Sequence, residues 1–220
     1  SATLGDFGQN YHYRATVALG GLAALPPVEA LYMRARGDQP RGLYDGLKAY
    51  RLHFPADRLP PVNSFWSLSL YEATAEGQFF FADNPLDRYA IGDRTEGLAY
   101  NDDGSLDIWI GSESPGEDRQ GNWLPAPAGP FALFMRTYLP KPELLDQINA
   151  IRENLTVGGR TLVQGALSWL WARHDRMIPI PGFKTVAQVE ENAGALAFGP
   201  LPAEQMAAID RILHGDKAMS

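Results

Sequence analysis

Hydrophobic and polar residues follow two different periods along this chain. Between residues 29 and 139, apolar and polar side chains alternate in short runs, and this period of two is typical of half-buried strands. After residue 142, apolar side chains recur every three or four positions, which is typical of amphipathic helices. The change of period near residue 145 predicts two parts, residues 1–145 and residues 146–220.

The first part is predicted to begin with a helix and to continue as strands. Residues 6–23 carry apolar side chains at helical spacing, Asp6 is the expected N-cap, and Pro26 and Pro27 follow the end of the helix. Turn-forming residues separate the alternating runs beyond it. Seven strands are expected, at residues 29–36, 49–54, 65–71, 78–81, 89–91, 106–110 and 131–139.

In the second part, four apolar stripes predict helices, and residues 177–180 predict a single strand. Short strands at regular spacing are typical of sandwiches and jelly rolls. We therefore predict an α+β fold, an antiparallel β-sandwich of jelly-roll type with an N-terminal helix and a C-terminal helical tail.

The composition narrows the classes of partner. The 220 residues include 19 Lys and Arg against 26 Asp and Glu, with no basic cluster that would bind nucleic acid phosphates. No apolar run approaches the roughly 20 residues that span a bilayer. We therefore expect neither nucleic acid nor a membrane as a partner.

Two features of the sequence are relevant to the cellular localisation of the protein: its cysteine content and its first residues. The chain has no cysteine, which excludes disulfides and thiol nucleophiles. It begins at Ser1 without a basic segment, so we expect no export signal in it. Both observations leave the localisation open.

Several motifs in order carry a family resemblance in the first part. They are YRLHF at 50–54, PPVNSFWSL at 60–68, NP at 84–85, RYAIGDR at 88–94 and NWLPAP at 122–127. With these motifs the first part resembles the domain of unknown function numbered 1214, usually the C-terminal half of a protein whose N-terminal half is the domain numbered 1254. The resemblance implies a jelly-roll sandwich and no settled reaction.

The second part is similar to the C-terminal quarter of an aldo-keto reductase barrel. The similarity rests on LVQGALSWL at 162–170, IPIPG at 178–182 and VEEN at 189–192. It implies that a helix N-terminus would hold the 2′-phosphate of NADPH. The implied cofactor-binding residues are Gly182, Lys184, Gln188, Glu191 and Asn192.

Nothing upstream resembles the strands that carry the catalytic residues of that family. Because one strand of eight cannot close a barrel, we expect no reductase activity, and NADPH is a cofactor only if the reductase-like segment retains binding. The whole chain resembles a fusion of the two families.

Four carboxylates near Trp109 and Trp123 are the candidate catalytic residues. Two positioned carboxyl groups suffice for glycoside hydrolysis, so a glycosidase-like hydrolase is one hypothesis. The alternative is that these residues solvate loops of an acidic protein. The candidates are Asp93, Asp107, Glu113 and Glu117, with Asp118 beside them.

Arginine and aromatic residues form a candidate binding site for a glycan or another small polar ligand. Arg136 and Tyr138 share one face of their expected strand. The alternative is a structural network of arginines and aspartates. The candidate ligand-binding residues are Arg88, Arg94, Trp66, Trp109, Trp123, Arg136 and Tyr138.

The histidines His12, His53, His174 and His214 form no metal-binding pattern, so no metal site is expected. We interpret His53 as an outward or hydrogen-bonded strand residue, with a catalytic role as the alternative.

The predicted helical tail has apolar faces that need a cover. They can pack on the sandwich or on a second copy of the chain. We therefore predict a homo-oligomer formed through the tail, most simply a twofold dimer.

Overall fold

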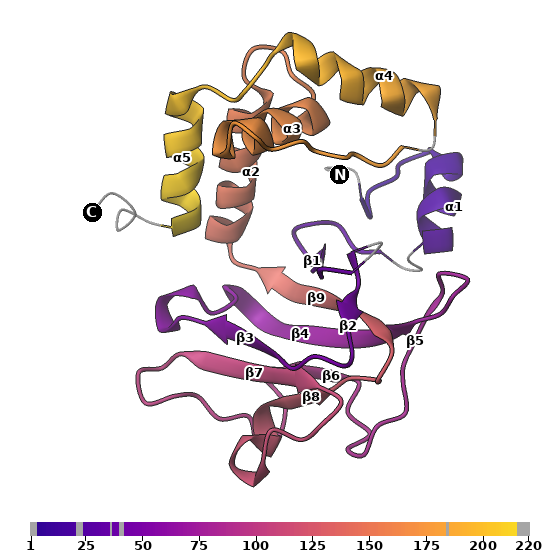
Figure 1. The fold of residues 1–220 in the computed structure, drawn as a ribbon, viewed down its shortest axis with the longest axis vertical. Coiled ribbons are helices and arrows are strands. Elements are labelled where there is room, and N and C mark those ends of the chain that lie inside the picture. The colour runs from indigo at the N-terminus through magenta and orange to yellow at the C-terminus, as the bar shows by residue number, and fades with distance from the viewer. Residues whose placement is uncertain (1–3, 21–23, 36, 40–41, 184, 215–220) are drawn as a thin grey trace. The chain divides into compact units, whose positions relative to one another are not determined.

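The computed structural model describes residues 4–20, 24–35, 37–39, 42–183 and 185–214. Contacts divide the chain into two compact units, Ser1–Lys141 and Pro142–Ser220, which we call unit 1 and unit 2. All described strands lie in unit 1, whereas the described elements of unit 2 are helices (Figure 1). The chain is thus a mixed α and β protein with antiparallel sheets.

Unit 1 begins with helix α1, Tyr11–Gly20. The helix starts later than predicted, because the side-chain oxygen of Asn10 accepts a hydrogen bond of 3.0 Å from the backbone N–H of Tyr13 and acts as the N-cap. Asp6 is therefore not the cap. Gly8 has a left-handed φ of 49°, which a helix cannot include. Residues 21–23 of the predicted helix lie outside the described residues.

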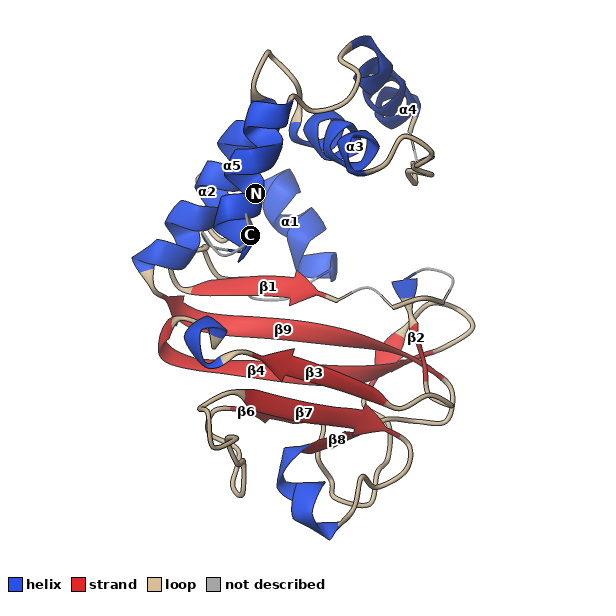
Figure 2. Cartoon of the chain, turned by 60° about the vertical axis from the view of Figure 1, so that its left-hand side comes forward, coloured by secondary structure: helices blue, strands red, loops and turns tan. Residues whose placement is uncertain are grey.

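A six-stranded antiparallel sheet forms the larger layer of unit 1 (Figure 2). Its main path runs β1–β9–β4–β5, while β2 pairs with β9 and β6 pairs with β4. The strands are β1 (Ala30–Arg34), β2 (Tyr44–Asp45), β4 (Val62–Ala73), β5 (Phe79–Phe80), β6 (Ala90–Gly92) and β9 (Pro130–Pro140).

The second sheet has three strands, β3 (Tyr50–Phe54), β7 (Leu106–Gly111) and β8 (Trp123–Pro125). The β3–β7 pair is antiparallel and the β7–β8 pair is parallel. Two short 3-10 helices, η2 (Ala56–Arg58) and η3 (Glu117–Asn122), complete unit 1. Both sheets are open, and jelly-roll connectivity stays a prediction.

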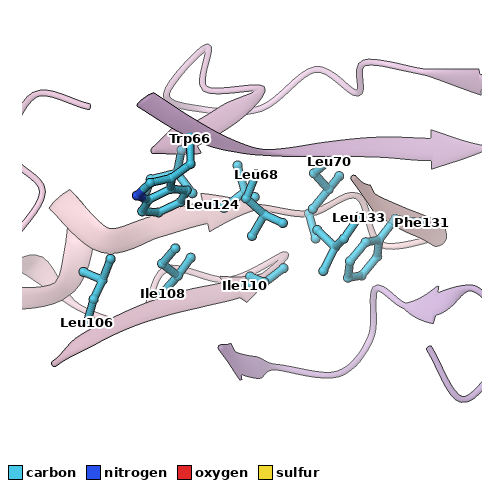
Figure 3. Close-up of a cluster of buried hydrophobic side chains, with 11 residues drawn as sticks. Trp66, Leu68, Leu70, Leu106, Ile108, Ile110, Leu124, Phe131 and Leu133 are labelled. Atoms are coloured by element: carbon cyan, nitrogen blue, oxygen red, sulfur yellow. The ribbon is translucent and has the colours of Figure 1, made fainter. Parts of the chain in front are cut away.

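The inner faces of the two sheets share one hydrophobic core. Alternate residues of β4 and β9 meet alternate residues of β7, as the period of two requires (Figure 3). The core residues include Trp66, Leu68, Leu70, Leu106, Ile108, Ile110, Leu124, Phe131 and Leu133. All seven predicted strands are present, whereas β2 and β8 are too short to show alternation.

Unit 2 consists of α2 (Pro142–Thr156), α3 (Leu162–Arg173), α4 (Val186–Gly194), the 3-10 helix η4 (Ala195–Ala197) and α5 (Ala203–His214). Helix α3 begins with a capping box in which Thr161 and Gln164 bond each other's backbone N–H. None of the described helices combines the length and apolar character needed to cross a membrane.

The strand predicted at residues 177–180 is wrong. These residues form an irregular segment in which Ile178 and Ile180 are exposed. A strand needs a neighbour for its backbone hydrogen bonds, and the described part of unit 2 offers no strand to pair with.

Candidate functional site

The outer face of the three-stranded sheet carries a group of polar and aromatic side chains. Strand β3 directs Tyr50, Leu52 and Phe54 toward the core, so Arg51 and His53 project from the opposite face. The antiparallel register pairs Arg51 with Trp109 and His53 with Asp107. Four side chains from two strands thus meet on one face.

Asp107 is the centre of this group. Its Oδ1 lies 2.8 Å from Nδ1 of His53 and 3.8 Å from Nε of Arg51. Its Oδ2 accepts a hydrogen bond of 3.1 Å from the side-chain amide of Asn101. Three neighbours therefore fix the orientation of one carboxylate.

These neighbours also set the charge state of Asp107. Partial burial alone would raise its pKa, but the hydrogen bonds from His53 and Asn101, together with the charge of Arg51, outweigh burial. The pKa of Asp107 is therefore lowered from the ordinary value of a carboxyl group, and the side chain is ionised at neutral pH.

The depressed pKa of Asp107 predicts a contribution to acid stability. The unfolded carboxyl binds its proton at a higher pH than the folded one, so this contribution is complete above about pH 4 and is lost as the pH falls through the lower folded value. Asp107→Asn should flatten the decline of the unfolding free energy below about pH 4, as measured by urea denaturation across pH. An unchanged slope would contradict the assignment.

Two arginines lie close to the ring of Trp109. The guanidinium carbon of Arg119, from η3, lies 4.5 Å from the centre of the indole ring, and that of Arg51 lies 5.9 Å from it. The ring forms part of the wall of a polar hollow of about 290 Å³, which we call the Trp109 hollow. Its lining residues are Arg51, Ala99, Tyr100, Asn101, Asp107, Trp109, Asp118, Arg119 and Asn122.

Asn122 lines the Trp109 hollow and links the segments around it. Its side-chain oxygen accepts a hydrogen bond of 2.8 Å from the N–H of Ala99. Its amide nitrogen donates to the carbonyls of Ala99, at 2.7 Å, and Asp107, at 2.8 Å. One buried side chain therefore ties η3 to the loop at residue 99 and to β7.

Two of the three predicted ligand-binding tryptophans are buried. Trp66 and Trp123 are each only 3% exposed, so neither can contact a ligand, and that prediction is wrong for them. Trp66 fills the core between the sheets, and the indole N–H of Trp123 donates to the carbonyl of Gly111 at 3.0 Å. Trp109 lines the hollow.

The predicted ligand-binding arginines and Tyr138 have structural partners away from the hollow. Arg88 donates to the carbonyls of Gln120, Gly121 and Trp123, and burial lowers its pKa. In a separate group, Arg94 lies 4.3 Å over the ring of Phe65, on which Tyr138 stacks, and Arg136 donates to Ser69 and Tyr71. None of these four residues lines the Trp109 hollow.

The candidate carboxylates do not form one group at the hollow. Asp93 is a structural acceptor for the backbone N–H of Trp66 at 3.0 Å. Glu113 and Glu117 are exposed beyond β7. Of the four, only Asp107 lines the hollow, with Asp118 as the second carboxylate there.

The residues implied as cofactor-binding are spread along unit 2. Gly182 is exposed and Lys184 lies outside the described residues. The backbone N–H of Gln188 donates to the hydroxyl of Thr185, the N-cap of α4. Glu191 and Asn192 lie further along α4, where the carbonyl of Glu191 accepts from Gln164 of α3. No group of three or more acidic or histidine residues in the described ranges is arranged to hold a metal ion.

Sequence reasoning missed Asn101, Arg119 and Asn122, and it left His53 without a partner. The one available signal was the alternation that places Arg51 and His53 on the polar face of a strand. Nothing in the sequence places a residue of η3 over Trp109.

The strands of unit 1 coincide with a known family. The model of the family described as "Protein of unknown function (DUF1214)" matches residues 29–142, just over half of the chain and all nine strands of the described residues. The chain belongs to the DUF1214 family. The Aldo/keto reductase family model matches residues 104–214, again half of the chain, so the chain also belongs to that family over its C-terminal half. The two-part resemblance is confirmed.

Individual relatives match shorter stretches. "Pyridoxal reductase, chloroplastic" from Arabidopsis thaliana is 38% identical over 80 residues, which are 36% of this chain and 21% of the relative. The crystal structure of VPA0106 from Vibrio parahaemolyticus is 33% identical with a TM-score of 0.47, covering 58% of this chain and 30% of that one. An uncharacterized protein from Burkholderia cenocepacia is 18% identical with a TM-score of 0.34, covering 50% and 25%. The chain therefore spans less than a third of each of these proteins.

Proposed function

We propose that unit 1 of this DUF1214 protein binds a small polar ligand with an anionic group in the Trp109 hollow. The observation that carries the proposal is the state of Arg119. Its guanidinium is held over the ring of Trp109, and within the described residues it makes no hydrogen bond or ion pair. An arginine fixed in this way offers its N–H donors to a carboxylate or phosphate.

The stacking also favours an anion over a neutral sugar. A sugar ring needs a free aromatic face, but Arg119 lies over a face of Trp109. Asp107 is already engaged by His53, Asn101 and Arg51, and it makes no ion pair with Arg119 within the described residues. Asp118 also lines the hollow but is exposed, where solvent and salt screen its charge.

Binding of D-glucuronate compared with D-glucose tests this proposal. We expect calorimetry to detect glucuronate binding and no comparable binding of glucose. Arg119→Gln should weaken glucuronate binding at least about tenfold, the cost of a lost charged hydrogen bond.

Arg94→Gln is the matched control, because Arg94 also lies over an aromatic ring but does not line the hollow. It should leave glucuronate binding unchanged. Equal binding of glucose and glucuronate would favour a neutral sugar site, and an unchanged affinity in Arg119→Gln would refute the role of Arg119.

A second proposal is that the start of α4 binds the 2′-phosphate of NADPH, which the match to the Aldo/keto reductase family favours. The local residues fit a phosphate: Gly182 has open space where a side chain would be, and Thr185 caps an exposed helix start whose first N–H groups lack helical partners. They do not fit the nicotinamide half, because the described part of unit 2 has no barrel strand to hold it. No reduction step follows from this binding.

Binding of 2′-AMP compared with 5′-AMP separates a 2′-phosphate site from general nucleotide binding. We expect 2′-AMP to bind more tightly, and Lys184→Ala to abolish the difference. Equal affinity for the two nucleotides would rule out the site.

A third proposal is that the chain forms a twofold dimer through unit 2. Exposed apolar side chains between α3 and the start of α4 support it: Ile178, Ile180, Phe183 and Val186. Light scattering should give twice the chain mass of 24.2 kDa, and Ile180→Asp should shift it toward one chain mass. A monodisperse monomer in the unmodified protein would refute this proposal.

A further inference from the structure

The contact between His53 and Asp107 has the geometry of an oriented general base. Nδ1 of His53 faces the carboxylate at 2.8 Å, while within the described residues no hydrogen bond engages Nε2. The imidazole side chain is 43% exposed, so its free edge can reach water and small molecules.

The partner fixes which ring nitrogen carries the proton. An ionised carboxylate only accepts hydrogen bonds, so Nδ1 must donate to Asp107. In the neutral imidazole, Nε2 then holds a lone pair and can take a proton. The hydrogen bond from Asn101 to Asp107 and the ion pair of Asp107 with Arg51 keep this orientation in place.

The stability of the fold does not require the contact between His53 and Asp107. Both side chains lie on the outer face of strands whose backbones are already paired. The His53 side chain is partly exposed, and pairs of this kind contribute little to stability. The ordered network of Asn101, Asp107 and His53 beside a hollow therefore points to chemistry.

We propose that His53 is a catalytic general base that activates water to hydrolyse a small carboxylic ester carrying a second, anionic group. Asp107 is its positioning residue. The inference rests on the proposed function, because Arg119 would hold the anionic group while the ester reaches His53.

The step balances without a cofactor or a protein nucleophile. Nε2 of His53 takes a proton from water as the water oxygen forms a bond to the ester carbonyl carbon. The tetrahedral intermediate collapses, the bond to the alcohol oxygen breaks, and Nε2 returns the proton to that oxygen. The products are a carboxylic acid and an alcohol.

Arg51 is placed to stabilise the charge of the intermediate. It precedes His53 by two residues on the same face of β3, a spacing of about 7 Å along a strand. Arg51 approaches Asp107 through Nε, and within the described residues its terminal nitrogens make no hydrogen bond. They can donate to a developing oxyanion.

Hydrolysis of 4-acetoxybenzoate tests the proposal, with the neutral 4-acetoxybenzamide as the matched ester. We expect turnover of the benzoate, with a slower rate in D2O. His53→Gln should lower kcat about 100-fold or more and remove the D2O effect. Asp107→Asn should lower kcat with little change in KM, and circular dichroism should show both variants folded.

His174→Gln is the control, because His174 makes the corresponding contact with Asp175 at 3.0 Å on an exposed segment. It should keep the full rate. Equal rates for His53→Gln and His174→Gln would overturn the proposal by showing only unspecific imidazole catalysis. If glucuronate binds through Arg119 but no ester is hydrolysed, this inference fails and the binding function stands. If both esters are hydrolysed equally through His53, the general base stands and the anion site fails.

Discussion

Asn122→Ala is expected to lower the free energy of unfolding by about 2–4 kcal/mol and to weaken glucuronate binding. The substitution leaves the N–H and carbonyl of Ala99 and the carbonyl of Asp107 without their side-chain partner. Each buried polar group left unpaired costs about 1–3 kcal/mol, and water entering the hollow recovers part of that cost. Because Asn122 ends η3, the same loss frees the segment that carries Arg119.

Urea denaturation and calorimetry measure the two effects in the full chain. Asn63→Ala is the matched control, because Asn63 is an exposed asparagine on β4. It should change the unfolding free energy by no more than about 0.5 kcal/mol and leave binding intact. Similar losses in both variants would show that Asn122 does not anchor the site.

Periodicity predicted seven of the nine described strands of unit 1, because a sheet with one buried face imposes alternation on strands that are long enough to show it. The buried face of β4 and β9 carries apolar residues such as Leu68 and Leu133. The helix start was predicted less well, since Asp6 and Asn10 are both good caps and the choice depends on the backbone at Gly8.

Tryptophan positions could not be assigned to core or surface from composition. Trp66 and Trp123 are core residues, whereas Trp109 alternates with the buried Ile108 and Ile110 and is partly exposed. The alternation on β7 contained this distinction for Trp109. For Trp123 no such alternation could be seen, because β8 has only three residues and all of them are buried.

The His53–Asp107 contact required the register of two strands that are 54 residues apart. Register depends on how the whole sheet packs, so no local motif can indicate it. Arg88 shows the converse case. Its place in a group of arginine and aromatic candidates suggested a ligand, but its guanidinium donates to three backbone carbonyls.

The segment at residues 177–180 shows how context decides a motif. In a barrel its alternation would be completed by neighbouring strands, but unit 2 supplies only helices in its described residues. Unit 2 therefore resembles the Aldo/keto reductase family in sequence and has helices, but its described residues form no barrel strand that could align a nicotinamide.

Gly165→Ala is expected to lower the stability of unit 2 by about 2–4 kcal/mol. A Cβ at this position would overlap the carbonyl oxygen of Leu155 and lie 2.7 Å from its carbonyl carbon. These are backbone atoms of α2, so the helices α2 and α3 must separate, and overpacking of this kind costs about 1–3 kcal/mol or more. Hydrogen exchange read by mass spectrometry should show faster exchange in α2 and α3.

Gly182→Ala is the matched control, because, apart from its two chain neighbours, no heavy atom of the described residues lies within 4 Å of the added Cβ. It should leave exchange in both helices unchanged. The amides of β4 and β9 should keep their protection in Gly165→Ala, since they belong to the other compact unit. Loss of protection in those strands would show that the two units unfold together. Unchanged exchange in α2 and α3 would show that the packing of these helices tolerates a side chain at residue 165.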